Sequence, residues 1–253
     1  MDTLFSLSGR VALVTGASGT LGGHFARVLH AAGARVALAA RRTEATAKLA
    51  AECGEGAVSV PLDVTDPASI AACYTAAEAA LGGPCTIVVN NAGIAVTRPV
   101  LDMAPADFDD VLAVNLRGCF LVAQEGARRL VAAKRPGSIV NIASILGGRI
   151  IPGVAGYTAA KAGLLQMTRQ MAVEFARHGI RVNAIAPGYI ASDINAGFFA
   201  SDPGQAMLKR IPQRRLGAPE DLTGPLLLLA SDAGAHMTGS TITVDGGHSI
   251  NSL

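Results

Sequence analysis

The sequence predicts an α/β protein, in which a doubly wound parallel sheet of seven strands is flanked by helices and residues 1–253 form a single domain. Short runs of β-branched residues alternate with longer alanine-rich stretches, which is the pattern of strands joined by crossover helices. Several runs are apolar without alternation, as in strands that are buried on both faces. Hydrophobic residues make up 50% of the chain and charged residues 16%, so we expect a large core.

Seven short apolar segments are the expected strands. They span residues 10–15, 35–39, 57–62, 86–90, 138–142, 181–186 and 241–244.

Helical patterns lie between these segments. Leu21, Phe25, Val28 and Leu29 repeat at the spacing of one helix face. Further helices are expected over residues 67–81, 105–133, 155–178 and 219–231.

Residues 187–216 contain no clear element and are rich in Gly, Pro, Phe and Ser. A long irregular segment in a compact domain is usually a functional loop, so we expect a substrate-binding loop here.

Composition narrows the function classes and the compartment. The net charge of +2 gives no support for nucleic-acid binding, and the chain has neither an apolar run long enough to span a membrane nor a basic signal sequence. Its four cysteines form no C-x-x-C pair, and no histidine or cysteine spacing suggests a metal site. We therefore expect reduced thiols and a cytoplasmic protein.

The first expected strand runs directly into a glycine-rich turn, Gly16-Ala-Ser-Gly-Thr-Leu-Gly22, and then into a helix. Backbone N–H groups and the helix dipole at such a turn favour a phosphate group. The context therefore predicts a dinucleotide-binding site rather than a plain tight turn.

The end of the second strand indicates which dinucleotide is bound. An acidic residue there would favour NAD, but Ala39-Ala40 are followed by Arg41 and Arg42. Two guanidinium groups suit a 2′-phosphate, so NADP is favoured over the alternative of a solvated pair at the start of a helix capped by Thr43.

Tyr157 and Lys161 are four residues apart, and Ser144 precedes Tyr157 by thirteen residues. Positions i and i+4 share one face of a helix, which brings a phenol close to an ammonium group. A phenol titrates near pH ~10, and a nearby cation favours its ionised form. The serine hydroxyl could hold a carbonyl oxygen to which the tyrosine transfers a proton.

Taken together, the motifs resemble those of the short-chain dehydrogenase/reductase family over essentially the whole chain. The matching segments are Thr15 to Gly22, Asp63-Val64, Asn90-Asn91-Ala92-Gly93, Asn115, Ser144, Tyr157, Lys161, Pro187-Gly188 with Ile190 and Ser192, and Asp245-Gly246-Gly247. Thr20 departs from the family pattern, because it stands where a second glycine is expected.

The resemblance implies a Rossmann fold and hydride transfer between NADP(H) and a carbonyl carbon. In reduction Tyr157 would donate the proton, Ser144 would bind the carbonyl oxygen, Lys161 would favour the phenolate and bind the nicotinamide ribose, and Asn115 would position a relay water. The implied cofactor contacts are Gly16, Ser18, Gly19, Thr20, Leu21, Gly22, Arg41, Arg42, Asp63, Val64, Asn91, Ala92, Gly93, Tyr157, Lys161, Pro187, Gly188, Ile190 and Ser192.

The substrate is less closely defined. Apolar residues in the expected pocket segments, among them Ile145, Ile150, Tyr189 and Phe199, favour a small-molecule ketone, as in carbonyl reductases and alcohol dehydrogenases. As alternatives, the opening segment Leu4-Phe-Ser-Leu-Ser-Gly-Arg10 resembles gluconate-type polyol dehydrogenases, and 3-oxoacyl carrier-protein reductases share all of the motifs. The resemblance also implies a homotetramer that uses the two long central helices.

Overall fold

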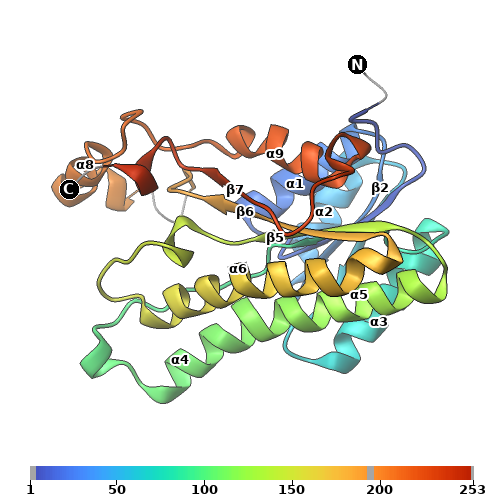
Figure 1. The fold of residues 1–253 in the computed structure, drawn as a ribbon, viewed down its shortest axis with the longest axis horizontal. Coiled ribbons are helices and arrows are strands. Elements are labelled where there is room, and N and C mark those ends of the chain that lie inside the picture. The colour runs from blue at the N-terminus through green and yellow to red at the C-terminus, as the bar shows by residue number, and fades with distance from the viewer. Residues whose placement is uncertain (1–3, 193–196, 252–253) are drawn as a thin grey trace.

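The computed structural model describes residues 4–192 and 197–251, which form one seven-stranded sheet with helices on both faces (Figure 1). All strand pairs are parallel and the order across the sheet is β3-β2-β1-β4-β5-β6-β7. The strands are β1 (Val11–Thr15), β2 (Arg35–Ala40), β3 (Ala57–Pro61), β4 (Ile87–Asn90), β5 (Gly137–Ile142), β6 (Ile180–Pro187) and β7 (Thr241–Val244). The predicted class is confirmed, and each predicted strand end lies within one residue of the observed end.

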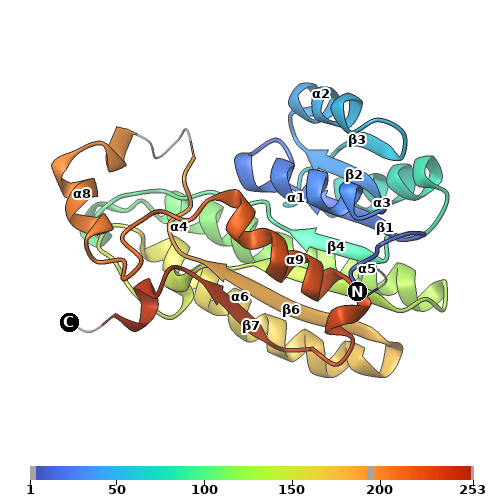
Figure 2. The same ribbon diagram turned by 90° about the horizontal axis from the view of Figure 1, so that it is seen from above.

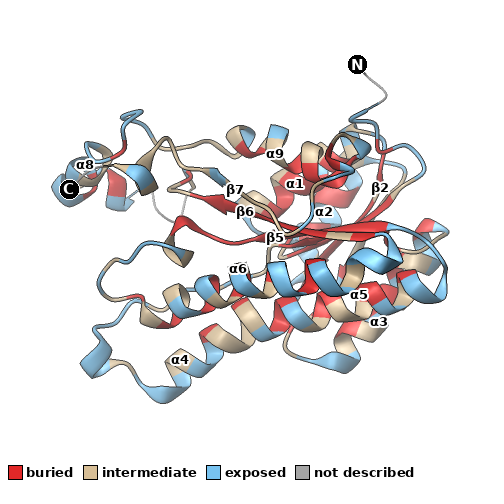
Figure 3. Ribbon diagram, viewed as in Figure 1, coloured by how far each residue is buried: buried red, intermediate tan, exposed pale blue. Residues whose placement is uncertain are grey.

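Two layers of helices cover the sheet, and Figures 1 and 2 show them on opposite faces. One face packs against α1 (Thr20–Ala31), α2 (Thr43–Cys53) and α9 (Thr223–Ala230). The other packs against α3 (Pro67–Leu81), α5 (Cys119–Ala132) and α6 (Ala155–Phe175). Figure 3 shows that the central strands are buried between these layers, whereas the edge strands β3 and β7 are partly exposed. Burial on both faces explains the continuous apolar runs of the central strands.

Three predicted helices are less regular than expected. Residues 105–133 form α4 (Pro105–Leu112), a π-helical turn η2 (Ala113–Gly118) and α5. Residues 155–178 form α6 and a final 3₁₀ turn η4 (Ala176–His178), and residues 219–231 begin with the 3₁₀ turn η5 (Pro219–Leu222) before α9. Thr43 is the first residue of α2 rather than its cap, which is Arg42.

The prediction of an irregular segment over residues 187–216 was wrong in part, because it contains the helix α8 (Asp202–Leu208). The Ser201 hydroxyl caps this helix by accepting the N–H of Gly204 at 3.4 Å. A seven-residue helix is too short to show a clear period in the sequence. Residues 193–196, which belong to the same predicted loop, lie outside the described residues.

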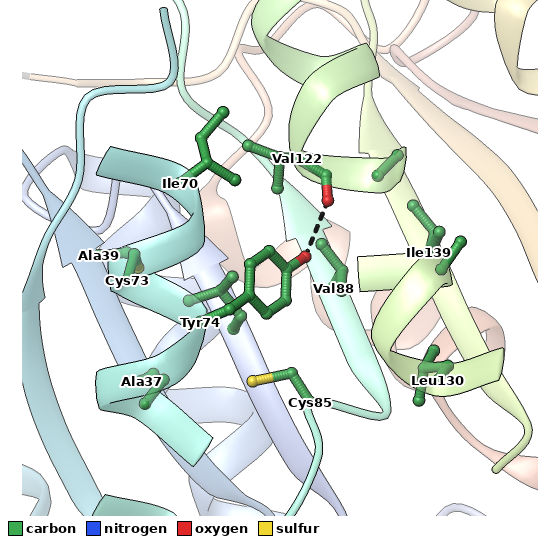
Figure 4. Close-up of a cluster of buried hydrophobic side chains, with 14 of the residues drawn as sticks. Ala37, Ala39, Ile70, Cys73, Tyr74, Cys85, Val88, Val122, Leu130 and Ile139 are labelled. Carbon is green, nitrogen blue, oxygen red and sulfur yellow. Dashed lines mark hydrogen bonds between the residues drawn. The ribbon is translucent and has the colours of Figure 1, made fainter. Parts of the chain in front are cut away.

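The core between α3 and α5 is built around Tyr74 (Figure 4). Tyr74 is fully buried, and its hydroxyl donates a hydrogen bond to the carbonyl of Val122 at 2.9 Å. Gly126 allows this approach, since a Cβ atom there would lie 2.5 Å from the Tyr74 hydroxyl. Burial raises the pKa of Tyr74 well above its ordinary value.

Among the described residues, no helix has the length and the hydropathy that a membrane crossing requires.

Candidate active site

The glycine-rich turn joins β1 to α1 through two close backbone approaches. Gly16 has a φ of +65°, and a Cβ atom at this position would lie 2.8 Å from the Cα of Ala92. A Cβ atom at Gly22 would lie 2.3 Å from the carbonyl oxygen of Gly16. The turn is therefore closed by glycines at its two ends. Thr20 is the exposed first residue of α1 and follows the N-cap Gly19.

Hydrogen bonds fix this turn against the end of β4. The backbone N–H groups of Asn91 and Ala92 both donate to the Thr15 hydroxyl at 3.0 Å. The Asn91 side chain donates to the carbonyls of Thr15 at 3.0 Å and Gly16 at 3.2 Å. Thr15 is thus part of the site, although the sequence prediction did not include it among the site residues.

A cavity of about 520 Å³ lies over these turns at the carboxyl ends of the strands, where open α/β sheets bind their ligands. Fourteen predicted cofactor residues line it: Gly16, Ser18, Gly19, Thr20, Leu21, Gly22, Arg41, Arg42, Asp63, Val64, Asn91, Ala92, Gly93 and Ser192. Four residues absent from the prediction also line it, namely Ala40, Leu62, Ile94 and Val114. These are immediate chain neighbours of predicted site residues, so strand ends were the signal that could have identified them.

One end of the cavity carries two unpaired arginines. The exposed guanidinium groups of Arg41 and Arg42 make no hydrogen bond or ion pair with any part of the chain that the structure describes. Asp63 lies nearby and accepts the side-chain and backbone donors of Thr65 at 2.7 and 2.9 Å. These bonds, with a smaller contribution from Arg41, hold the pKa of Asp63 below its ordinary value. An anionic group such as a phosphate suits this end.

Lys161 and Tyr157 lie in the first two turns of α6. The Lys161 ammonium is buried, donates to the carbonyl of Ile142 at 2.8 Å, and lies 5.5 Å from the centroid of the Tyr157 ring. Since Ile142 ends β5, this bond ties the cation to the sheet. The predicted phenol and ammonium therefore do share one face of the helix.

Ser144 follows β5 and is 8% exposed. Its Oγ accepts the N–H of Leu146 at 3.1 Å, and its own hydroxyl hydrogen is not engaged by any described residue. The short 3₁₀ turn η3 (Ile145–Gly147) then packs on α6, because a Cβ atom at Gly147 would lie 2.9 Å from the Lys161 carbonyl. This packing brings the segment of Ser144 next to Lys161.

Asn115 lies in the π-helical turn η2 and is fully buried. Its side-chain oxygen accepts the N–H of Ile94 at 2.8 Å, and its amide nitrogen donates to the Ile94 carbonyl at 2.8 Å. Asn115 therefore holds the segment after β4 at the edge of the cavity. One amide hydrogen and one lone pair remain for a further partner.

The last predicted cofactor segment follows β6. Gly188 donates to the carbonyl of Val244 at 2.9 Å, and a Cβ atom there would lie 2.7 Å from the Asp245 side chain. The Ile190 side chain is buried in the core. Pro187, Gly188, Ile190, Tyr157 and Lys161 are not among the lining residues of the cavity, whereas Ser192 is.

A metal ion would need at least three histidine, cysteine or carboxylate side chains close together. Residues 4–192 and 197–251 contain no such group.

Comparisons with known proteins agree with this geometry. A family model described as enoyl-(acyl carrier protein) reductase matches residues 16–249. The chain is 40% identical to nodulation protein G of Rhizobium sp. (strain N33) over 96% of this chain and 98% of that protein. It is 38% identical to gluconate 5-dehydrogenase of Gluconobacter oxydans (strain 621H), with 98% of both chains covered.

A solved structure shows the same fold. The crystal structure of a gluconate 5-dehydrogenase from Burkholderia cenocepacia J2315, in complex with NADP and tartrate, matches with a TM-score of 0.93 and 35% identity over 99% of both chains.

The fold, the site and these relatives define an NAD(P)-dependent oxidoreductase that acts on CH–OH groups. The chain belongs to the short-chain dehydrogenase/reductase family.

Proposed function

We propose that this protein catalyses the NADPH-dependent reduction of a ketone to a secondary alcohol and the reverse oxidation. The observation that carries the proposal is the buried Lys161 ammonium, fixed by Ile142 and 5.5 Å from the Tyr157 ring centroid beside the segment of Ser144. A fixed cation there would stabilise the negative charge that develops on the Tyr157 oxygen while the proton is transferred.

Each proposed role follows from what the side chain contacts. Tyr157 exchanges the proton with the substrate oxygen, and Ser144 donates its unengaged hydroxyl hydrogen to that oxygen. Asn115 uses its remaining donor and acceptor for the water that connects Lys161 to solvent. The nicotinamide, when bound, supplies or accepts the hydride.

NADP is the proposed cofactor. The unpaired Arg41 and Arg42 line the cavity just after β2, where a 2′-phosphate would lie. The complex of NADP with the related Burkholderia dehydrogenase supports this choice.

A polyhydroxylated keto acid related to gluconate is the proposed substrate class, and the named gluconate dehydrogenases support it. The predicted apolar lining gives less support for a purely apolar ketone. Ile150 is 84% exposed, while Ile145 and Phe199 are buried.

The reduction of 3-oxoacyl thioesters is a second candidate, favoured by the 35% identity of the chain to a 3-oxoacyl-[acyl-carrier-protein] reductase of Rickettsia bellii. Lys134 and Arg135, the basic pair available to an acidic carrier protein, lie between α5 and the start of β5. They are therefore at the amino ends of the parallel strands, at the opposite edge from Ser144. The position of this pair therefore gives no support for a carrier protein docked beside the site.

We also propose that the protein forms a homotetramer. Phe120, Val131 and Val173 on α5 and α6 are 38%, 42% and 78% exposed, which is unusual for large apolar side chains gathered on two neighbouring helices. These exposed side chains support the proposed homotetramer, in which the two helices would pack against a second copy, and light scattering coupled to size exclusion would test it.

The test of the function is the oxidation of NADPH and NADH with a panel of 5-ketogluconate, neutral keto-sugars, aryl ketones and 3-oxoacyl thioesters. We expect turnover of 5-ketogluconate with NADPH. Turnover confined to thioesters would move the function to the second candidate, and no turnover of any carbonyl would overturn the proposal.

A further inference from the structure

Tyr189 lies at the start of the segment after β6 that is the expected substrate-binding loop. Tyr189 follows β6 and is half-buried. Burial raises the pKa of its phenol, and the charge of Tyr157 raises it further, so the two phenols are within electrostatic reach. The Tyr189 ring contacts Phe199 and His248, with centroids 5.4 and 5.7 Å apart. Its environment therefore extends from Tyr157 to the C-terminal turn.

His248 is held rigidly in that turn, at the start of the 3₁₀ turn η7 (His248–Ile250). Its backbone N–H donates to the carbonyl of Asp245 at 3.2 Å. The Asp245 carboxylate accepts the backbone N–H groups of Gly247 at 2.8 Å and Ser249 at 2.6 Å. The Nδ1 atom of His248 is buried without a hydrogen-bond partner in the part of the chain that the structure describes.

The side chain of Arg149 and the backbone of Arg210, from distant segments, contact the C-terminal turn. Arg149 lies five residues after Ser144, and its guanidinium donates to the carbonyl of Ser249 at 2.5 Å. The carbonyl of Arg210, just after α8, accepts the side-chain N–H of Asn251 at 2.7 Å. Figures 1 and 2 show α8 and the C-terminal turn gathered at the same end of the molecule.

The charges in this corner are not balanced. Burial lowers the pKa of His248, and although Asp245 opposes this shift, Arg149 and Arg210 both lower the pKa further. Asp245 already binds two backbone N–H groups, and neither arginine forms an ion pair with a described residue. Arg149 has five N–H donors, of which one is engaged by Ser249.

An anionic group on the substrate would complete this arrangement. A carboxylate matches the planar fork of a guanidinium and can take two of its N–H groups at once. Arg149 and Arg210 are exposed, so water solvates both guanidinium groups in the free protein, and an acid offers them a charge-assisted hydrogen bond that a neutral hydroxyl group does not. The corner thus selects for acids among the keto-sugars that fit the proposed function.

We propose that Arg149, assisted by His248 and Arg210, binds the carboxylate of a keto-acid substrate while the keto carbon lies at Tyr157. This specificity site rests on the proposed reductase activity and adds the residues that distinguish an acid from a neutral sugar.

The test compares Arg149→Gln, Arg149→Lys and the wild-type protein with NADPH and two substrates, 5-ketogluconate and the neutral sugar L-sorbose. We expect Arg149→Gln to raise the KM for 5-ketogluconate by about tenfold to a hundredfold, as for the loss of a hydrogen bond to a charged group. The KM for L-sorbose should change less than about twofold, and Arg149→Lys should recover part of the loss because it keeps the charge. Arg169→Gln is the matched control, since Arg169 is exposed on α6 and bonds only Gln166 among the described residues.

The outcomes separate the two proposals. Parallel rises in KM for both substrates would show that Arg149 only supports the C-terminal turn through Ser249, and would overturn the carboxylate site while leaving the reductase activity intact. A wild-type protein that reduces no carbonyl compound would overturn the proposed function itself. Thermal unfolding of each variant shows whether the fold is retained. If Arg149→Gln does not fold, Arg210→Gln takes its place, because it keeps the Arg149–Ser249 bond. Arg210→Gln should then raise the KM for 5-ketogluconate but not the KM for L-sorbose.

Discussion

Tyr157 is the residue from which the proposed chemistry can be tested most directly. Replacement by Phe removes the proton donor and leaves the ring, so we expect kcat to fall by about a hundredfold to ten-thousandfold. NADPH binding, measured by fluorescence titration, should change little. Retention of most of the activity by Tyr157→Phe would contradict the assigned role.

Replacement of Arg41 and Arg42 tests the proposed preference for NADP over NAD. Because neither guanidinium has an ion-pair partner among the described residues, their replacement breaks no ion pair with those residues. We expect Arg41→Ala/Arg42→Ala to raise the KM for NADPH by at least about tenfold and to leave the KM for NADH nearly unchanged. Equal rises in the KM values for NADPH and NADH would show that the arginines do not bind the 2′-phosphate.

At the scale of the element, the turn between β1 and α1 depends on Gly22. A Cβ atom would lie 2.3 Å from the Gly16 carbonyl at Gly22, but 3.6 Å from it at Gly19. We expect Gly22→Ala to lower the free energy of unfolding by about 1–3 kcal/mol and Gly19→Ala to lower it by less than about 1 kcal/mol. Urea unfolding without cofactor measures both, and similar losses in the two variants would contradict the close approach as the cause.

Some elements could be predicted from the sequence because their signals are local. The helix α3 has the predicted ends 67 and 81, since Asp66 caps it at 2.9 Å and Gly82 ends it with a φ of 69°. The π-helical turn η2 could not be predicted. Asn115 lies in this turn and forms two hydrogen bonds with Ile94, which is twenty-one residues away in sequence.

The residues of the site also fall into two groups, those that local motifs identify and those that long-range contacts place. The glycine turn and the Tyr157–Lys161 pair are short motifs with a fixed spacing, so their residue numbers could be predicted. The contact of His248 with Tyr189 joins residues that are fifty-nine positions apart, and nothing in the sequence near either residue indicates it. Long-range packing therefore decides the substrate end, whereas local motifs decide the cofactor end.

At the scale of the whole molecule, buried ionisable groups limit stability at high pH. Burial raises the pKa of Cys73 to about 12, and it also raises the pKa values of Cys85 and Tyr74. All three stay protonated in the folded protein while the unfolded chain loses protons above about pH 9. The unfolded state then binds fewer protons, so the free energy of unfolding should decrease as the pH rises from about 9 to 11.

Tyr74→Phe provides the control for this prediction. It removes one buried titrating group and the bond to Val122, so it should cost about 0.5–1.5 kcal/mol at neutral pH and make the alkaline decrease shallower. Urea unfolding across this pH range measures both effects. An identical decrease in the variant would show that other groups cause the alkaline instability.

The pairing of β6 with β7 has a consequence for the order in which the protein becomes active. Ribosomal synthesis proceeds from the N-terminus, so β6 leaves the ribosome well before β7. Until then Gly188 cannot donate to Val244, and Tyr189 has no His248 ring to pack against. A nascent chain already able to form the cofactor turn between β1 and α1 would therefore still lack an ordered substrate end, and competence for selective turnover would be acquired only after β7 and His248 have been synthesised.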